Sequence, residues 1–240
     1  MSTEPHRRSS RGAAELRPIS VQLDAAPYAE GSCLIAMGET RVLCAASVEE
    51  TAPAWRKGSG RGWVTAEYAM LPRATHTRTP RERGTLGGRT QEIQRLIGRS
   101  LRACVDLTAL GERTIRVDCD VIQADGGTRT ASITGGAIAL RRACRWLVDQ
   151  QLLDRDPFRT HVAAISVGIV DGEILLDLDY SEDSRAEVDL NVVAIEGGGL
   201  VEVQGTAEAA PFSPEQLQRM VTIASRGIER LFTLQHDAVG

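Results

Sequence analysis

A glycine-rich run, Asp125-Gly-Gly-Thr-Arg-Thr, lies where a strand-like pattern gives way to a helical one. Glycines let a backbone approach a ligand closely, and the free N–H groups at the start of a helix attract anions. Gly127, Thr128 and Arg129 are therefore candidate phosphate ligands, because a hydroxyl and a guanidinium add donors for phosphate oxygens. The spacing is not that of a Walker loop, and a plain turn capped by threonines is the alternative.

Arg89 stands just before a helix that we expect over residues 90–107, where apolar residues recur at three- and four-residue steps. The helix dipole disfavours a cation at a helix start. A bound anion next to Arg89 would offset this unfavourable interaction. Arg95 and Arg99 fall outside the apolar stripe of this helix. They are candidates for RNA contact, with a solvated helix face as the alternative.

The segment before that helix, residues 72–88, is rich in Pro, Gly, Thr and Arg and almost free of apolar residues, which predicts an exposed loop. Arg73, Arg78 and Arg81 lie in it, together with His76. Such a basic loop suits a phosphodiester backbone, and a contact between subunits is the alternative. His76 by itself is better explained as a surface histidine than as a general acid.

Acidic residues gather farther along the chain. They are Asp177, Asp179, Glu182, Asp183, Glu187 and Asp189. We expect a strand over residues 173–178 that continues far enough to place Asp177 and Asp179 on one face. Clustered carboxylates repel one another unless a cation lies between them, and Mg²⁺ is the usual cation in phosphoryl chemistry. An exposed acidic hairpin is the alternative.

The basic and acidic groups are separated along the chain. Residues 56–102 hold eleven basic and three acidic residues, a net of +8, whereas residues 171–208 hold eleven acidic and one basic, a net of −10. Transfer to inorganic phosphate needs a cationic cradle, a basic track for the RNA, and a metal or an acid near the leaving oxygen. The sequence offers all three, and no Ser-His-Asp or Cys-His pattern competes.

The elements that must position these residues follow from periodicity and turn signals. We expect strands over residues 17–23, 33–47, 63–70, 114–124, 162–170, 173–178, 186–195 and 200–204, with a hairpin turn inside the second. A helix is expected over residues 130–153. A last helix begins at the capping box Ser213-Pro-Glu-Gln and runs to about residue 234.

This order predicts an α/β (α+β) fold with mixed sheets and packed helices. We divide it into a flexible N-terminus over residues 1–14 and a single domain over residues 15–240. Its first half, residues 15–150, holds the candidate phosphate site, and its second half, residues 160–240, holds the acidic pair. The N-terminus lacks a secretory signal and no apolar run is long enough for a membrane span, so we expect a cytoplasmic protein with no membrane partner. The five cysteines form no CxxC pair and are expected to be buried, reduced thiols.

Long stretches of the sequence resemble the ribonuclease PH family. They run from Val42-Leu-Cys-Ala-Ala, through Gly62-Trp-Val-Thr-Ala-Glu-Tyr-Ala-Met-Leu-Pro-Arg73 and Gly88-Arg89-Thr-Gln-Glu-Ile-Gln-Arg95, to Asp118–Thr134 and Asp177–Glu208. The resemblance covers nearly the whole chain after the first dozen residues. It implies the ribonuclease PH fold, with duplicated β-α halves, and a homo-hexamer built as a trimer of dimers.

The activity implied by the resemblance is phosphorolysis of RNA from its 3′ end, chiefly of precursor tRNA and also of rRNA, with release of nucleoside 5′-diphosphates. The reverse reaction would add nucleotides to 3′ ends. By position, Arg89 and Gly127–Arg129 match the phosphate ligands of the family. Asp183 and Asp189 match its acidic pair, assigned to Mg²⁺ binding or acid catalysis, and Arg73, Arg78 and Arg81 fall in its segment for RNA or ring contacts.

Three other functions are kept open. An inactive RNA-binding ring subunit would lack part of the set Arg89, Arg129, Asp183 and Asp189, and here the set is complete. A hydrolytic nuclease would release monophosphates without added phosphate. A nucleotide-binding regulatory protein is disfavoured because no Walker or Rossmann fingerprint is present.

Overall fold

A five-stranded sheet forms the first half of the computed structural model, which describes residues 11–82, 84–208 and 211–240. Its strands are β1 (Ile19–Leu23), β2 (Gly31–Met37), β3 (Thr40–Glu49), β4 (Trp63–Met70) and β5 (Thr114–Gln123). They lie in the order β1-β2-β3-β5-β4, with β4 parallel to β5 and the other neighbours antiparallel. The predicted hairpin turn between β2 and β3 is confirmed, with Gly38 in the left-handed region at φ +59°.

A four-stranded sheet forms the second half. Its strands are β6 (Val162–Val170), β7 (Glu173–Leu176), β8 (Val188–Ile195) and β9 (Leu200–Ala207), in the order β7-β6-β8-β9. All neighbours in it are antiparallel. The expectation of mixed sheets therefore holds for the first sheet and is wrong for the second, where short turns join β6 to β7 and β8 to β9 as antiparallel hairpins.

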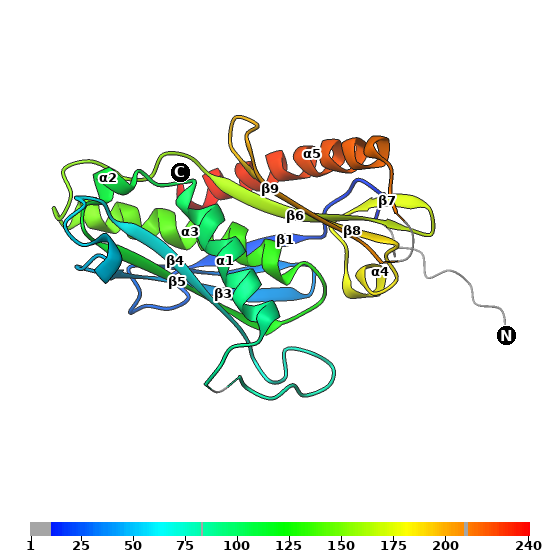
Figure 1. Cartoon of the computed structure of the whole chain (residues 1–240), viewed down its shortest axis with the longest axis horizontal. Helices are drawn as coiled ribbons and strands as arrows, with labels where there is room; N and C mark the ends of the chain where they lie inside the picture. The colour runs from blue at the N-terminus through cyan, green and yellow to red at the C-terminus, as the bar shows by residue number, and fades with distance from the viewer. Residues whose placement is uncertain (1–10, 83, 209–210) are drawn as a thin grey trace.

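The helices are α1 (Gly88–Arg102), α2 (Leu107–Leu110), α3 (Thr128–Asp149), α4 (Tyr180–Asp183) and α5 (Pro214–Val239), and a 3-10 turn lies at Ala54–Arg56. Helix α3 packs against β2 and β3 on one side and β6 on the other, so it lies between the two sheets. Helix α5 runs along the β6–β8 side of the second sheet, and α1 crosses beside β4 (Figure 1).

The central position of α3 explains its sequence. Its predicted apolar stripe, Ile133, Ala137, Leu140, Ala143 and Leu147, is buried. The polar side chains of Ser132 and Thr134 are buried as well, because sheets cover both sides of its first turns. Ser132 donates to the carbonyl of Thr128, and Thr134 accepts from the amide of Ala164 on β6, so these hydroxyls are satisfied.

Several predicted boundaries need correction. The helix expected over residues 90–107 ends at Arg102, and a separate helix α2 follows, capped by the carboxylate of Asp106. Strand β7 ends at Leu176, so Asp177 and Asp179 do not share a strand face. Asp177 adopts φ +57°, and Asp179 caps α4 in a capping box with Glu182. Local side-chain capping thus replaces the expected extension of the strand.

Residues 11–14, which we expected to be flexible, contact the second half of the molecule. Arg11 forms an ion pair with Glu182 at 3.3 Å, and the carbonyl of Ala13 accepts from the amide of Leu176. The rest of the predicted flexible start, residues 1–10, lies outside the described residues. The five cysteines are buried and unpaired, as predicted. No helix in the described part of the chain could span a membrane.

Candidate active site

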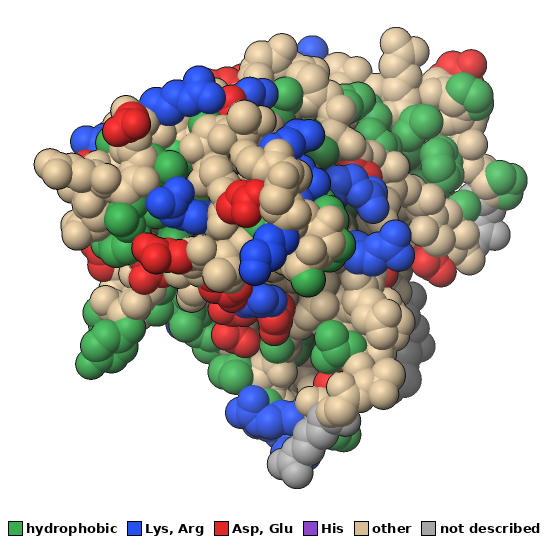
Figure 2. Space-filling model, turned by 60° about the vertical axis from the view of Figure 1, so that its left-hand side comes forward, with side chains coloured by type: hydrophobic (Ala, Val, Ile, Leu, Met, Phe, Trp, Pro, Cys, Tyr) green, Lys and Arg blue, Asp and Glu red, His purple; other side chains and the backbone are tan. Residues whose placement is uncertain are grey.

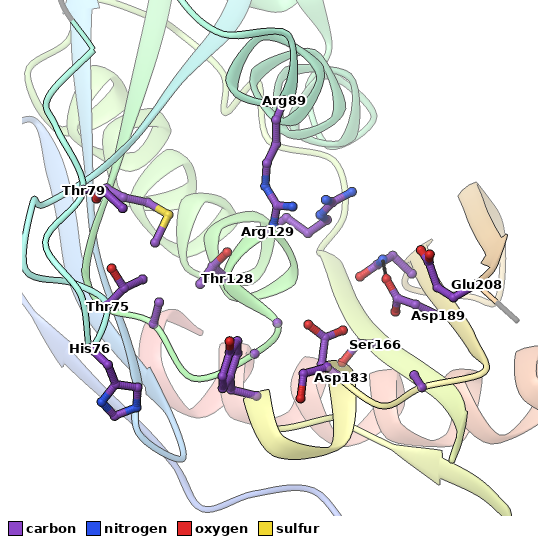
Figure 3. A pocket seen from close by; sticks show the side chains of 18 of the residues that line it. Thr75, His76, Thr79, Arg89, Thr128, Arg129, Ser166, Asp183, Asp189 and Glu208 are labelled. Carbon is purple, nitrogen blue, oxygen red and sulfur yellow. Dashed lines mark hydrogen bonds between the residues drawn. The ribbon is translucent and has the colours of Figure 1, made fainter. Parts of the chain in front are cut away.

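A cavity of about 730 Å³ lies between the two halves of the molecule. Segments far apart in the sequence line it: the loop after β4, the start of α1, the turn before α3, helix α4, and strand β8. Figure 3 shows two arginines on one side of the cavity and two aspartates on the other. All six residues predicted for the phosphate site and the acidic pair line it, and they are Arg89, Gly127, Thr128, Arg129, Asp183 and Asp189.

The turn before α3 presents backbone to the cavity. Gly126 and Gly127 both have left-handed φ values, +75° and +63°, and Gly127 is the N-cap residue of α3. Helix α3 begins at Thr128, two residues earlier than predicted. Thr128 and Arg129 are therefore the first two helical residues, where free N–H groups and the helix dipole favour an anion. The hydroxyl of Thr128 lies 2.8 Å from the hydroxyl of Tyr68 on β4.

The two arginines come from the starts of two different helices. Arg89, predicted to lie just before the helix, is the second residue of α1, and the first turn of α1 contains no acidic residue. Its side chain points toward Arg129 in Figure 3. Burial raises the pKa of Tyr68, whereas the positive charges of Arg89 and Arg129 act in the opposite direction. Two guanidinium groups converge beside a helix N-terminus, and this arrangement suits an oxyanion with several oxygens.

Arg129 is held from two sides. Its Nη1 lies 3.3 Å from Oε1 of Glu92 on α1 and 3.3 Å from Oε1 of Gln204 on β9. Gln204 in turn donates to the same Glu92 oxygen at 3.0 Å. This network connects α1, β9 and the candidate phosphate turn, residues 125–129, around one guanidinium group.

The acidic pair comes from two elements of the second half. Asp183 ends α4 and opens onto the cavity, and Asp189 lies on β8. Burial, together with the charge of Asp183, raises the pKa of Asp189 to about 6, and the charge of Arg129 acts in the opposite direction. Desolvation also raises the pKa of Asp183, opposed by the charges of Arg89, Arg129 and Arg17. A carboxyl group whose pKa lies near neutral pH, next to a second carboxylate, is suited to proton transfer.

The Oδ1 atom of Asp189 is buried and has no hydrogen-bond partner among the described residues, while its Oδ2 accepts from Asn191 at 3.3 Å. A buried carboxylate oxygen without a donor leaves room for a proton or a cation. In the described ranges no group of three or more His, Cys, Asp or Glu side chains is placed to hold a metal ion. Two carboxylates still fit Mg²⁺, which usually binds one or two carboxylates and keeps several waters.

The structure separates the predicted RNA-contacting arginines from this cavity. Arg73, Arg78 and Arg81 are exposed on the loop after β4, while Thr75, His76, Thr77 and Thr79 of that loop line the cavity. Arg95 and Arg99 lie on the exposed face of α1, beside a different hollow that also includes Glu202 of β9. Arg99 forms an ion pair with Glu202. None of these five arginines lines the cavity: three are exposed on the loop after β4 and two on α1.

The separated charges of the sequence meet in the fold. The basic α1 lies beside the acidic second half, and Figure 2 shows arginine and acidic side chains next to one another over one face.

Sequence reasoning missed several residues of the cavity, including Tyr68, Ser166 and Asn191. Asn191 follows Asp189 by two residues on β8, so strand alternation could have placed both on one face. Tyr68 and Ser166 lie in predicted strands with no local feature that distinguishes them from other core residues.

Comparisons with known proteins agree with this site. The family model described as 3′ exoribonuclease family, domain 1, matches residues 15–145, and that of domain 2 matches residues 160–227. A ribonuclease PH of Methylobacterium radiotolerans is 60% identical over 97% of this chain and 99% of its own length. A ribonuclease PH of Parasynechococcus marenigrum is 58% identical over 98% of this chain and 94% of its own length.

Solved structures share the fold at low identity. Rice Rrp46 superimposes with a TM-score of 0.79 at 19% identity, covering 96% of this chain and 98% of its own. A chain of the Archaeoglobus fulgidus exosome, solved with RNA bound to the active site, also gives 0.79 at 21% identity, with coverage of 92% and 89%. The predicted fold is therefore confirmed, and this chain belongs to the ribonuclease PH family of 3′ exoribonucleases.

Proposed function

We propose that this chain is a phosphorolytic 3′→5′ exoribonuclease of tRNA processing that uses the cavity between its halves as its active site. The family membership supports the activity. The observation that carries the proposal for the site is the convergence of Arg89, Arg129 and the N-terminus of α3 opposite Asp183 and Asp189. A cavity of this kind holds a small oxyanion at one end and a second phosphate group, with its leaving oxygen, at the other.

In this proposal inorganic phosphate binds to Arg89, Thr128 and Arg129. One of its oxygens forms a bond to the phosphorus of the last phosphodiester, and the bond from that phosphorus to the 3′ oxygen of the preceding nucleotide breaks. The products are a nucleoside 5′-diphosphate and an RNA shortened by one nucleotide. Two anions must approach each other in this step, and the two guanidinium groups offset their repulsion while holding them in place.

The leaving 3′ oxygen must gain a proton. Asp189, with its pKa raised to about 6, is the carboxyl group in the cavity best suited to hold a proton before the reaction. Asp183 and Asp189 would also hold Mg²⁺, which when bound would neutralise negative charge near the leaving oxygen. The residues of this chain would bind the phosphate and orient it toward the RNA end, and because phosphate itself attacks the phosphorus, the step needs no nucleophilic side chain.

The remaining expectations concern RNA and assembly. The exposed arginines Arg73, Arg78 and Arg81 would guide the RNA backbone toward the cavity, and Arg95 and Arg99 would extend that track along α1. The family resemblance supports rRNA as a further substrate, nucleotide addition as the reverse reaction, and a homo-hexamer built as a trimer of dimers. Sedimentation of the purified protein tests the hexamer. A cytoplasmic location stays a prediction from the sequence.

The activity test uses a tRNA with extra 3′ nucleotides, Mg²⁺, and reactions with and without inorganic phosphate. Nucleoside 5′-diphosphates that form only with phosphate are the expected product. Monophosphates formed without phosphate would identify a hydrolytic nuclease, and RNA binding without any product would identify an inactive subunit. Arg89→Ala should abolish phosphorolysis and leave RNA binding nearly unchanged; loss of both would assign Arg89 a structural role instead.

A further inference from the structure

Arg17, the arginine that precedes β1, contacts the backbone of the turn before α3. Nη1 of Arg17 donates to the carbonyl of Asp125 at 2.5 Å, and Nη2 lies 3.5 Å from the carbonyl of Gly126. Its side chain is almost fully buried. One guanidinium group thus binds two consecutive carbonyls of the turn, and Arg17 is not among the residues that line the cavity.

Arg17 is itself held by a carboxylate of the second half. Nη2 of Arg17 donates to Oδ1 of Asp177 at 2.7 Å, and the backbone amide of Arg17 donates to Oδ2 at 2.8 Å. Asp177 is fully buried and adopts a left-handed φ of +57°, a conformation that costs energy for a residue other than glycine. Both carboxylate oxygens therefore accept from Arg17, at a strained position of the backbone, and Nη1 of Arg11 forms a longer ion pair with Oδ2 at 3.8 Å.

The contacts leave little freedom for the turn. A Cβ on Gly127 would lie 3.1 Å from Nη2 of Arg17, and a Cβ on Gly126 would lie 2.4 Å from the carbonyl oxygen of Leu178. The hydroxyl of Thr40 donates to the carbonyl of Gly126 at 2.6 Å and accepts from the amide of Asp125. The turn is thus enclosed between β1, β3 and the segment that follows β7.

That last segment leads to the acidic residue Asp183. Asp179 caps α4, and the amide of Tyr180 in α4 donates to the carboxylate of Asp125 at 3.3 Å. The Arg17–Asp177 pair therefore joins the turn that presents Gly127 to the segment that ends in Asp183. Buried ion pairs contribute little net stability relative to apolar replacements, so a role in fixing geometry is the better explanation of this one.

We propose that Arg17 and Asp177 are positioning residues that fix the phosphate-binding turn at its distance from the acidic pair. The inference rests on the proposed function, because it assigns phosphate to that turn. Without the guanidinium group, the carbonyl of Asp125 loses its donor and the carbonyl of Gly126 keeps only the hydroxyl of Thr40, so the turn can rotate its N–H groups away from the cavity. Phosphate then binds more weakly, while the RNA track on the loop and on α1 is unchanged.

The test compares Arg17→Gln and Arg17→Lys with Arg113→Gln as a matched control. Arg113 also donates from its guanidinium group to two backbone carbonyls, those of Leu110 and Leu152, but lies outside the cavity. We expect Arg17→Gln to raise the KM for phosphate at least tenfold while the KM for RNA changes less than twofold. Arg17→Lys, which can keep one contact to Asp177, should recover part of the phosphate affinity. Arg113→Gln should leave both KM values unchanged.

A purely structural role of Arg17 predicts a different pattern. Loss of folded enzyme lowers the apparent kcat and leaves both KM values unchanged, and that result would overturn the proposal. If Arg17→Gln does not fold, the KM values for phosphate and for RNA are compared in Arg17→Lys and Asp177→Asn instead. Two further readouts accompany the kinetics: circular dichroism for the fold, and the rise in unfolding temperature caused by inorganic phosphate alone.

The thermal measurement separates the two proposals. A wild-type protein that is stabilised by phosphate but releases no nucleoside diphosphate contradicts the proposed function and still tests the Arg17 inference. Phosphate should then stabilise the wild type and Arg113→Gln to the same extent, and Arg17→Gln much less. Equal stabilisation of all three proteins would reject the positioning role.

Discussion

The hydroxyl of Tyr68 on β4 lies 2.8 Å from the hydroxyl of Thr128, the first residue of α3. This contact connects the edge strand of the first sheet to the phosphate turn. Tyr68 is almost fully buried, so its ring fixes the position of the hydroxyl. The strand therefore helps to hold the side chain that we propose as a phosphate ligand.

Tyr68→Phe should weaken phosphate binding and slightly destabilise the fold. The variant removes one buried hydrogen bond, with a cost of about 0.5–1.5 kcal/mol in the free energy of unfolding. Thr128 then loses the partner that orients it, so we expect the KM for phosphate to rise a few-fold. Tyr28→Phe is the control, because Tyr28 is fully exposed. Kinetics identical to the wild type in Tyr68→Phe would show that Thr128 is positioned by its backbone alone.

Glu92→Gln should strengthen phosphate binding at low ionic strength. Glu92 lies 3.3 Å from Arg129 and is partly exposed, so its charge competes with phosphate for that guanidinium group. Glutamine keeps an oxygen acceptor for Arg129 and removes the charge. Exposed pairs of this kind are worth about 0.2–1 kcal/mol, which corresponds to a decrease of up to about fivefold in the KM for phosphate. The difference should shrink in high salt. A raised KM would instead mean that the ion pair aligns Arg129 for binding.

The elements that surround the site could largely be predicted from the sequence. Residues 63–70 and 162–170 were predicted as strands and form β4 and β6 with the same bounds. The capping box at Ser213 was predicted and is present at the start of α5. Arg89 was identified as a cation at a helix start, and it lies in the first turn of α1. These features are local, so the side chains and turns that specify them are adjacent in the sequence.

Features that depend on distant residues could not be predicted. Residues 176–179, Leu-Asp-Leu-Asp, alternate as a strand would, yet the chain turns at Asp177, where Arg17 supplies a buried partner for the carboxylate. Nothing near Asp177 in the sequence identifies that partner, which lies 160 residues away. Helix α4 was missed for a related reason, since its four residues are too few to show a helical period.

Gly126→Ala should damage the site far more than Gly172→Ala, although both glycines have nearly the same φ, +75° and +76°. An alanine in that conformation costs about 1–2 kcal/mol at either position. At Gly172 a Cβ meets nothing within 4 Å, whereas at Gly126 it would lie 2.4 Å from the carbonyl of Leu178. We therefore expect Gly126→Ala to lose more stability and to raise the KM for phosphate at least tenfold. Equal losses in thermal unfolding, with unchanged kinetics, would contradict the close packing of the turn.

Asp189→Asn should stabilise the metal-free, phosphate-free protein at pH 7.5 while abolishing most activity. Burial and the charge of Asp183 raise the pKa of Asp189 from 3.8 to about 6. Between these two pH values the folded state binds more protons than the unfolded state, so stability falls as pH rises through that window. Above it the ionised carboxylate carries a penalty of about 1–3 kcal/mol, since one pKa unit corresponds to about 1.4 kcal/mol.

Asparagine removes that penalty and keeps an oxygen that can accept from Asn191. In EDTA, the variant should therefore unfold at higher denaturant or temperature than the wild type at pH 7.5, and the difference should nearly vanish at pH 4, where Asp189 is protonated in the wild type. Asp154→Asn, at an exposed position, is the control and should show no such pH dependence. A stability change of Asp189→Asn that is the same at both pH values would mean that packing, rather than the buried charge, distinguishes the two proteins. The expected result would show that the carboxyl group of Asp189 lowers the stability of the fold, although the proposed activity needs this acid beside the candidate phosphate site.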